Sequence, residues 1–189
     1  AHRLHAAGLL SRIYALSESG FLSSPEGYVL PLAVRRMGRL RCLGAFADML
    51  QHMRDTSAQV WEFWRQRPGR DGRGWWAQLQ AFCAGALLAR WGGQDGIQFF
   101  SAAEASGPST ASWVAARLMR VPFAFAVRAR DLAAPGSNWA AMVQDAAFVR
   151  CDTEATRAAL IRLLPEAEGK AIVLRDPLTL TPPEDDADM

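Results

Sequence analysis

The sequence predicts an α/β fold in which a doubly wound parallel sheet is preceded by a helical hairpin. Half of its 189 residues are hydrophobic, which is sufficient for the core of one domain. In the second half, short apolar runs around Phe99, Phe123, Phe148 and Ile172 recur about every 24 residues, a spacing typical of strand–helix–strand units. Because crossover connections between such strands are right-handed, we expect all four to be parallel.

Residues 1–38 give no consistent pattern and form an ambiguous N-terminal segment. Residues 9–16 are compatible with a short helix, and the Ser-Ser-Pro-Glu-Gly sequence at 23–27 is typical of a turn. Residues 28–32 fit either the end of a strand or an extended connector. We therefore assign neither a definite secondary structure nor a role to this segment.

Residues 39–93 are expected to form an amphipathic hairpin rich in tryptophan and arginine. Apolar side chains at three- and four-residue spacings predict a helix over 39–64, either continuous or broken once. The glycine- and proline-rich stretch 67–74 should end this helix, since both residue types destabilise a helix interior. A second helix is predicted from Trp75 to Trp91, with Gly92 and Gly93 as its C-terminal stop.

Residues 94–180 contain the predicted sheet and its connecting helices. The apolar runs predict strands over 97–100, 122–127, 147–149 and 171–174. Helices are expected over 108–119, 138–145 and 153–164, and the residues suited to begin them are Pro108, Ser137 or Asn138, and Asp152 or Thr153. Residues 181–189 are expected to be a solvated acidic tail.

The composition argues against several classes of function. A net charge of +2 is too small to indicate nucleic-acid binding, and no P-loop, G-x-G-x-x-G or G-x-S-x-G motif occurs. The three cysteines lack C-x-x-C spacing, and His2 and His5 do not form a metal-binding pattern, so neither a metal nor a cofactor is predicted. The longest apolar stretch, 81–89, is too short to span a membrane, and no signal peptide is visible, so a cytoplasmic location is expected.

Several segments of the second half carry a family resemblance. Residues 105–113, 121–125 and 129–132 match in order and spacing, as do the strand and helix start at 145–154 and the last strand at 172–175. They resemble the acceptor-side domain of family 4 glycosyltransferases, of the type that builds bacterial exopolysaccharide and colanic-acid polymers. The resemblance implies that 94–180 is a Rossmann-like half of a GT-B fold.

The departures from that family concern its functional residues. The His-Ala-His-Phe motif is replaced by Ser-Ala-Ala-Glu at 101–104, and Arg128 stands where the family has histidine before Ala-x-Asp. No histidine follows His52, and residues 175–189 cannot build a nucleotide-sugar domain. The resemblance therefore implies a degenerate, non-catalytic interaction or structural subunit, although whether the chain is an enzyme stays open. The alternative is an acceptor-binding subunit or fragment of a split hexosyltransferase, with the donor domain on another chain.

The resemblance and the predicted sheet edge together define a candidate ligand cleft. Its residues are Glu104, Ser106, Gly107, Arg128, Arg130 and Asp131. Arg128 is open to two roles: a salt bridge to Asp131 or Glu104, or binding of a phosphate or carboxylate. It cannot be a general base, because a guanidinium stays protonated. Asp131 is either the N-cap of a short turn or a residual site residue.

A second cluster indicates an interface. It consists of Trp61, Trp64, Arg67, Arg70, Arg73, Trp75 and Trp76. Such residues are enriched in protein interfaces and also at membrane surfaces, and they can equally pack a hairpin beside a solvated loop. We expect a protein partner, with peripheral contact to the inner membrane left open. A nucleotide sugar is expected only if a second chain supplies the donor domain, and no nucleic acid is expected.

Overall fold

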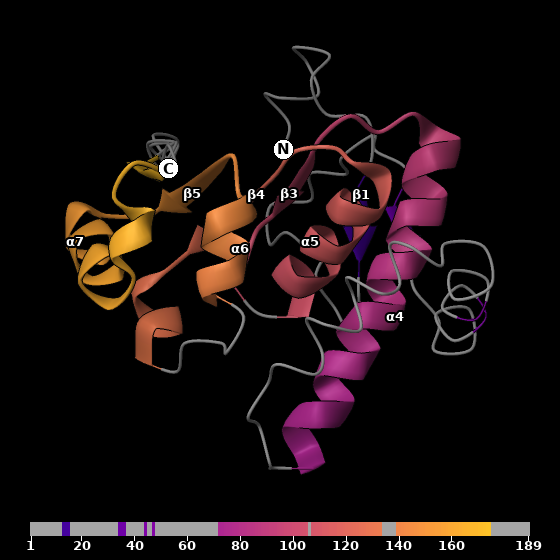
Figure 1. Cartoon of the computed structure of the whole chain (residues 1–189), viewed down its shortest axis with the longest axis horizontal. Coiled ribbons are helices and arrows are strands. Elements are labelled where there is room, and N and C mark those ends of the chain that lie inside the picture. The colour runs from indigo at the N-terminus through magenta and orange to yellow at the C-terminus, as the bar shows by residue number, and fades with distance from the viewer. Residues whose placement is uncertain are drawn as a thin grey trace, which may run out of the picture.

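The fold was analysed in a computed structural model (Figure 1). It describes residues 13–15, 34–36, 44, 47, 72–105, 107–133 and 139–174. The helix predicted over 39–64, the turn at 23–27 and the acidic tail lie outside the described residues. Within those that are described, no helix is long and apolar enough to cross a bilayer.

A four-stranded parallel sheet forms the centre of the described structure. Its strands are β3 (Phe100–Ala102), β4 (Phe123–Val127), β5 (Phe148–Cys151) and β6 (Ala171–Val173), and they lie side by side in that order. The α/β class and the parallel arrangement predicted from the apolar runs are thus confirmed. Because the order of the strands follows the chain, this sheet extends in one direction only. The reversal that defines a doubly wound sheet does not occur among these four strands.

A separate pair of parallel strands lies earlier in the chain. The strands are β1 (Ile13–Ala15) and β2 (Val34–Arg36), with Ile13 opposite Val34. β1 falls within the segment that suited a short helix, so that interpretation is wrong for these three residues. The β-branched Ile13 and the aromatic Tyr14 favour a strand locally.

Helices precede and connect the strands of the large sheet. They are α4 (Gly72–Asp95), α5 (Gly107–Met119), α6 (Trp139–Asp145) and α7 (Glu154–Leu163), with the short 3-10 helices η1 (Ala129–Ala133) and η2 (Pro165–Ala167). α5, α6 and α7 lie within one residue or so of their predicted bounds. Thr153 is the N-cap of α7: its hydroxyl accepts a 3.1 Å hydrogen bond from the Thr156 N–H.

The ends of α4 differ from those predicted. The helix begins at Gly72 rather than at Trp75, and it continues through Gly92 and Gly93 to Asp95. The left-handed stop is Gly96, at φ 66°, and the Ile97 N–H then donates to the Gly92 carbonyl at 2.9 Å. Gly92 instead permits close packing, since an added Cβ would lie 2.8 Å from both Met119 Sδ and Phe100 Cζ.

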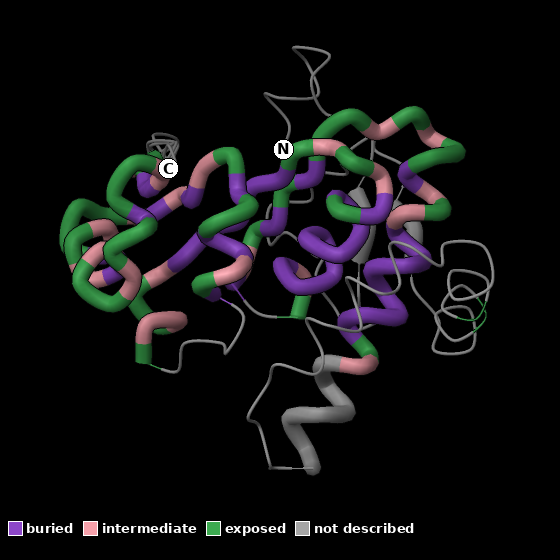
Figure 2. The backbone as a smooth tube through the Cα atoms, viewed as in Figure 1, coloured by how far each residue is buried: buried purple, intermediate pink, exposed green. Residues whose placement is uncertain are grey.

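The core lies between one face of the sheet and the helices. Phe123, Phe125, Val149 and other residues of that face share a buried cluster with Trp113 of α5 and with α6 and α7. In Figure 2 the buried segments run through the strands, α5 and the adjoining part of α4, whereas much of α7 is exposed. The opposite face is less covered: Phe99 stacks on Phe148 with ring centroids 6.0 Å apart, and Phe99 remains 40% exposed.

Candidate functional site

The candidate site lies at the carboxyl edge of the parallel sheet. Because parallel strands end at the same edge, the loops after β3, β4 and β5 bring together Glu104, Arg128 and Asp152. Val127 and Cys151 are register partners on β4 and β5. Arg128 and Asp152 directly follow these partners, so they leave neighbouring strands at the same level of the sheet, where adjacent strands lie about 5 Å apart. Open α/β sheets bind ligands at this edge.

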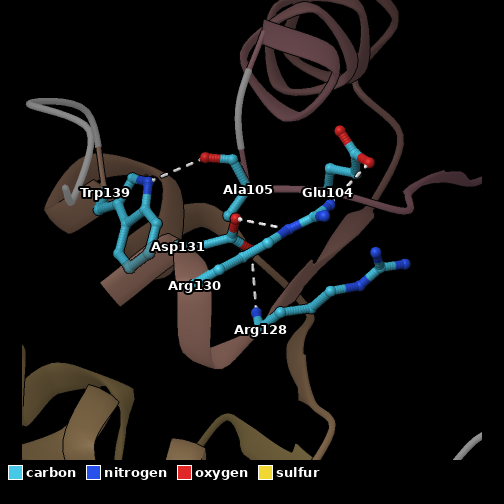
Figure 3. A network of polar contacts seen from close by, with 6 residues as sticks. All are labelled: Glu104, Ala105, Arg128, Arg130, Asp131 and Trp139. Atoms are coloured by element: carbon cyan, nitrogen blue, oxygen red, sulfur yellow. Dashed lines mark hydrogen bonds and ion pairs between the residues drawn. The ribbon is translucent and has the colours of Figure 1, made fainter. Parts of the chain in front are cut away.

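Arg130 ties two of these loops together (Figure 3). Its Nη2 lies 3.1 Å from Glu104 Oε1, and its Nε lies 3.8 Å from Asp131 Oδ1. The Arg130 side chain is 63% exposed, so each pair contributes at most about 1 kcal/mol to stability. The salt bridge that the sequence suggested for Arg128 is thus made by Arg130. The 3-10 turn of η1 projects Arg130, rather than Arg128, toward the loop after β3.

Asp131 stabilises the start of η1. Its Oδ2 accepts a 2.9 Å hydrogen bond from the Arg128 backbone N–H, and its own N–H donates to the Arg128 carbonyl at 2.9 Å. The carboxylate therefore reaches back to the first residue of the turn, as the acidic member of a capping box does. Asp131 is a capping residue, but from within the turn and not at the N-cap position that the sequence suggested.

Two polar groups at this edge lack partners among the described residues. The Arg128 side chain is half-buried, and among the described residues only its backbone, not its guanidinium, makes a hydrogen bond or ion pair; Figure 3 shows it beside Arg130. Asp152 Oδ1 is the one buried side-chain oxygen or nitrogen in the described part of the chain without a hydrogen bond. An unsatisfied buried acceptor requires an explanation, because most such atoms in folded proteins are paired.

The other candidate residues contribute less to the site. Gly107 is the exposed first residue of α5, and an added Cβ there would meet nothing within 4 Å, so no close backbone approach requires glycine. Ser106 lies outside the described residues. The interface residues Trp61, Trp64, Arg67 and Arg70 do as well. Arg73, Trp75 and Trp76 form the first turns of α4, where the structure describes the backbone alone.

A buried tryptophan that the sequence reasoning missed holds one of the loops at this edge in place. Trp139, the first residue of α6, is 3% exposed, and its Nε1 donates to the Ala105 carbonyl at 3.2 Å. This bond fixes the loop after β3, which carries Glu104, against the start of α6 (Figure 3). Asp152 was considered only as a helix cap. Its position directly after the third apolar run, equivalent to that of Arg128 after the second, is the signal that would have identified it.

Cys151 adjoins the site but is poorly suited to react. Burial raises the pKa of its thiol from 9.0 to about 11, and the negative charge of Asp152 adds to the rise. The thiol is therefore protonated near neutral pH, and the thiolate is the reactive form. Among the described residues, no three histidine, cysteine or acidic side chains gather as a metal site would require.

Comparisons with protein-family models, curated proteins and solved structures gave no match for this chain. A function is therefore inferred from the residues of the chain itself and from the geometry of the sheet edge.

Proposed function

We propose that this chain is a glycosyltransferase-like domain, a Rossmann-like half of a GT-B fold, that works as a non-catalytic interaction or structural subunit. The observation that carries the proposal is the ion pair between Arg130 and Glu104. Glu104 is the last residue of the segment that corresponds to the family's His-Ala-His-Phe motif. Its carboxylate links the loop after β3 to the loop after β4 through Arg130.

Sugar transfer requires a group that can accept a proton, and the polar residues described at this edge are poorly suited to that role. A general base must be free to accept a proton from the acceptor hydroxyl. Asp131 accepts the Arg128 N–H and faces Arg130, Glu104 faces Arg130, and Arg128 stays protonated. No histidine occurs among residues 72–174. These contacts support a role in which the polar residues hold the loops rather than transfer a proton.

The four parallel strands support the GT-B part of the proposal. β3, β4 and β5 place the resembling loops at one edge, in the order that an acceptor-side domain would need. The reversal of strand order that would make the whole sheet doubly wound, and the first arm of the helical hairpin, remain part of the proposal.

An acceptor-binding subunit of a split glycosyltransferase is the second candidate. It is favoured by the half-buried guanidinium of Arg128, which has no partner among the described residues and suits a phosphate or carboxylate on an acceptor. In that case a second chain would have to supply the nucleotide-sugar site.

The two candidates are separated by one experiment in two stages. First, the purified chain is incubated with a panel of nucleotide sugars, and release of the nucleoside diphosphate is followed by chromatography. We expect no release above that of buffer. Release that Glu104→Gln abolishes, while an exposed control such as Arg162→Gln retains it, would refute the non-catalytic role.

In the second stage the native complex is purified at low salt and its chains are identified by mass spectrometry. A stoichiometric partner that binds nucleotide sugar, and with which the chain transfers sugar, would establish the split enzyme. A stoichiometric complex that lacks any such chain and transfers no sugar would support the interaction subunit. A cytoplasmic location, peripheral to the inner membrane or not, is a proposal that fractionation of the same cells tests.

A further inference from the structure

We propose that Arg128 and Asp152 together form a binding site for a small hydroxylated anion, that is, a phosphate or carboxylate with a neighbouring hydroxyl group. The two residues directly follow the register partners Val127 and Cys151. Each carries a polar group for which the described structure provides no partner. This site does not depend on whether the domain has lost catalysis.

The anionic part of the ligand follows from Arg128. A guanidinium presents several N–H donors in a planar fork that matches a phosphate or carboxylate with two parallel hydrogen bonds. Arg130, two residues later, is already engaged by Glu104 and Asp131. Glu104 and Asp131 therefore both face Arg130, and none of the described residues pairs with the charge of Arg128, which is left for a ligand.

The hydroxyl part follows from Asp152. Its Oδ1 is a buried acceptor without a donor, so a ligand group that donates a hydrogen bond would satisfy it. We take this donor to be a neutral hydroxyl, because the positive charge of Arg157 already acts beside the negative charges of Asp152 and Glu154 at the adjacent Cys151. Since Oδ1 is shielded in this structure, binding should turn the Asp152 side chain and alter the start of α7 at Thr153.

Matched phosphate esters provide the test. Binding of glycerol 3-phosphate, methyl phosphate and phosphoethanolamine to the full chain is measured by titration calorimetry. Two-dimensional NMR follows the amides of Arg128, Asp152 and Thr153. We expect glycerol 3-phosphate to bind most tightly and to change the chemical shifts of all three amides. Methyl phosphate, which cannot donate to Asp152, should bind about tenfold more weakly, the effect of one charge-assisted hydrogen bond.

Variants assign the two halves of the site. Arg128→Gln should weaken the binding of glycerol 3-phosphate by about tenfold or more. Arg162 is an exposed arginine in the last turn of α7, and Arg162→Gln should leave that affinity unchanged. Asp152→Ala should remove the preference for glycerol 3-phosphate over methyl phosphate. Thermal unfolding of each variant checks that it is folded.

Three results would overturn the proposal. The first is no binding of any ester at millimolar concentration to the wild-type chain. The second is binding that weakens equally in Arg128→Gln and Arg162→Gln, which indicates attraction by net charge alone. The third is tighter binding of phosphoethanolamine than of glycerol 3-phosphate, which excludes the hydroxyl donor. If Arg128→Gln does not fold, the amide shifts in the wild-type chain decide, and shifts confined to other loops would count against the site.

Discussion

The indole N–H of Trp113 donates a 2.8 Å hydrogen bond to Asp145 Oδ2 and so joins the middle of α5 to the last residue of α6. Arg117, one turn after Trp113, places its Nε 2.7 Å from the same oxygen and its guanidinium 5.0 Å from the centre of the indole ring. One carboxylate thus satisfies a buried donor and orients a cation over the ring. This arrangement fixes α5 and α6 relative to each other.

Removing the Asp145 carboxylate should destabilise the fold. Trp113 is 2% exposed, so in Asp145→Ala its N–H would lose this acceptor in a place that water does not reach. We expect the free energy of unfolding, measured with urea, to fall by about 1–3 kcal/mol. Asp145→Asn keeps an acceptor oxygen and should therefore lower the free energy of unfolding by less. The Arg117 side chain is 40% exposed, so Arg117→Gln should cost at most about 1 kcal/mol. A larger loss in Arg117→Gln than in Asp145→Ala would contradict this assignment.

Gly85 sets the distance between α4 and α5. An added Cβ would lie 2.6 Å from Val114 Cβ and 2.8 Å from the Ala111 carbonyl oxygen, and a backbone atom cannot yield as a flexible side chain can. Gly85→Ala is therefore expected to lower the stability by about 1–3 kcal/mol despite the better helix propensity of alanine.

Gly93 supplies the matched control for Gly85. It lies in the same helix, but an added Cβ would meet nothing within 4 Å. Gly93→Ala should therefore raise the melting temperature, by an amount that corresponds to about 0.5–1 kcal/mol. If both alanine variants are stabilised, the helices can separate without cost and the close approach does not limit the packing.

Arg120 occupies a position that suits glycine. Its φ is 56°, and it ends α5 in a Schellman arrangement: the Val121 N–H donates to the Ala116 carbonyl at 3.0 Å, and the Arg120 N–H to that of Arg117 at 3.3 Å. A side chain in this left-handed conformation costs about 1 kcal/mol relative to glycine. Arg120→Gly should therefore stabilise the protein in urea unfolding, whereas Arg120→Val, with a β-branched side chain, should destabilise it.

A central strand of the sheet could be predicted from the sequence because it is buried on both faces. The unbroken apolar run at 122–127 predicted β4, and all five residues of β4 are buried. The regular spacing and the handedness of the connections also predicted that the four strands are parallel, as they are, but not their order or register. The end of α4 was misjudged because Gly92 serves packing against β3 and α5, which no local pattern reveals.

The site was less accessible to sequence reasoning. The sequence predicted that Glu104 and the arginines lie at one edge of the sheet, but not which arginine reaches Glu104 across 26 residues of chain. That choice depends on the 3-10 turn of η1, which is fixed by the hydrogen bond between Asp131 and the Arg128 N–H. Likewise, whether the Asp152 carboxylate finds a donor depends on packing around the start of α7, and a residue type alone does not determine it.

Cys151 should make the stability of the protein depend on alkaline pH. Its pKa is about 11 in the folded protein, against 9.0 for a free thiol, so the folded state holds its proton more firmly than the unfolded chain does. The stabilisation is complete below pH 9 and is lost as the pH rises from 9 through 11. Over that window we expect a loss of about 2 kcal/mol from this residue.

The measurement is urea unfolding at several pH values between 8 and 11 for the wild-type chain and for Cys151→Ala. Alanine removes the titrating group, so the difference in unfolding free energy between the two proteins isolates Cys151 from the other groups that titrate in alkali. Cys151→Ala leaves a small cavity and is therefore less stable at pH 8, but this deficit should shrink as the pH rises. A difference that stays constant across the range would mean that the thiol ionises alike in the folded and unfolded states. The same test reports on Asp152, because its negative charge is part of the cause. Asp152→Asn should make the loss of stability smaller and complete it at a lower pH, since the folded pKa falls while the unfolded pKa is unchanged.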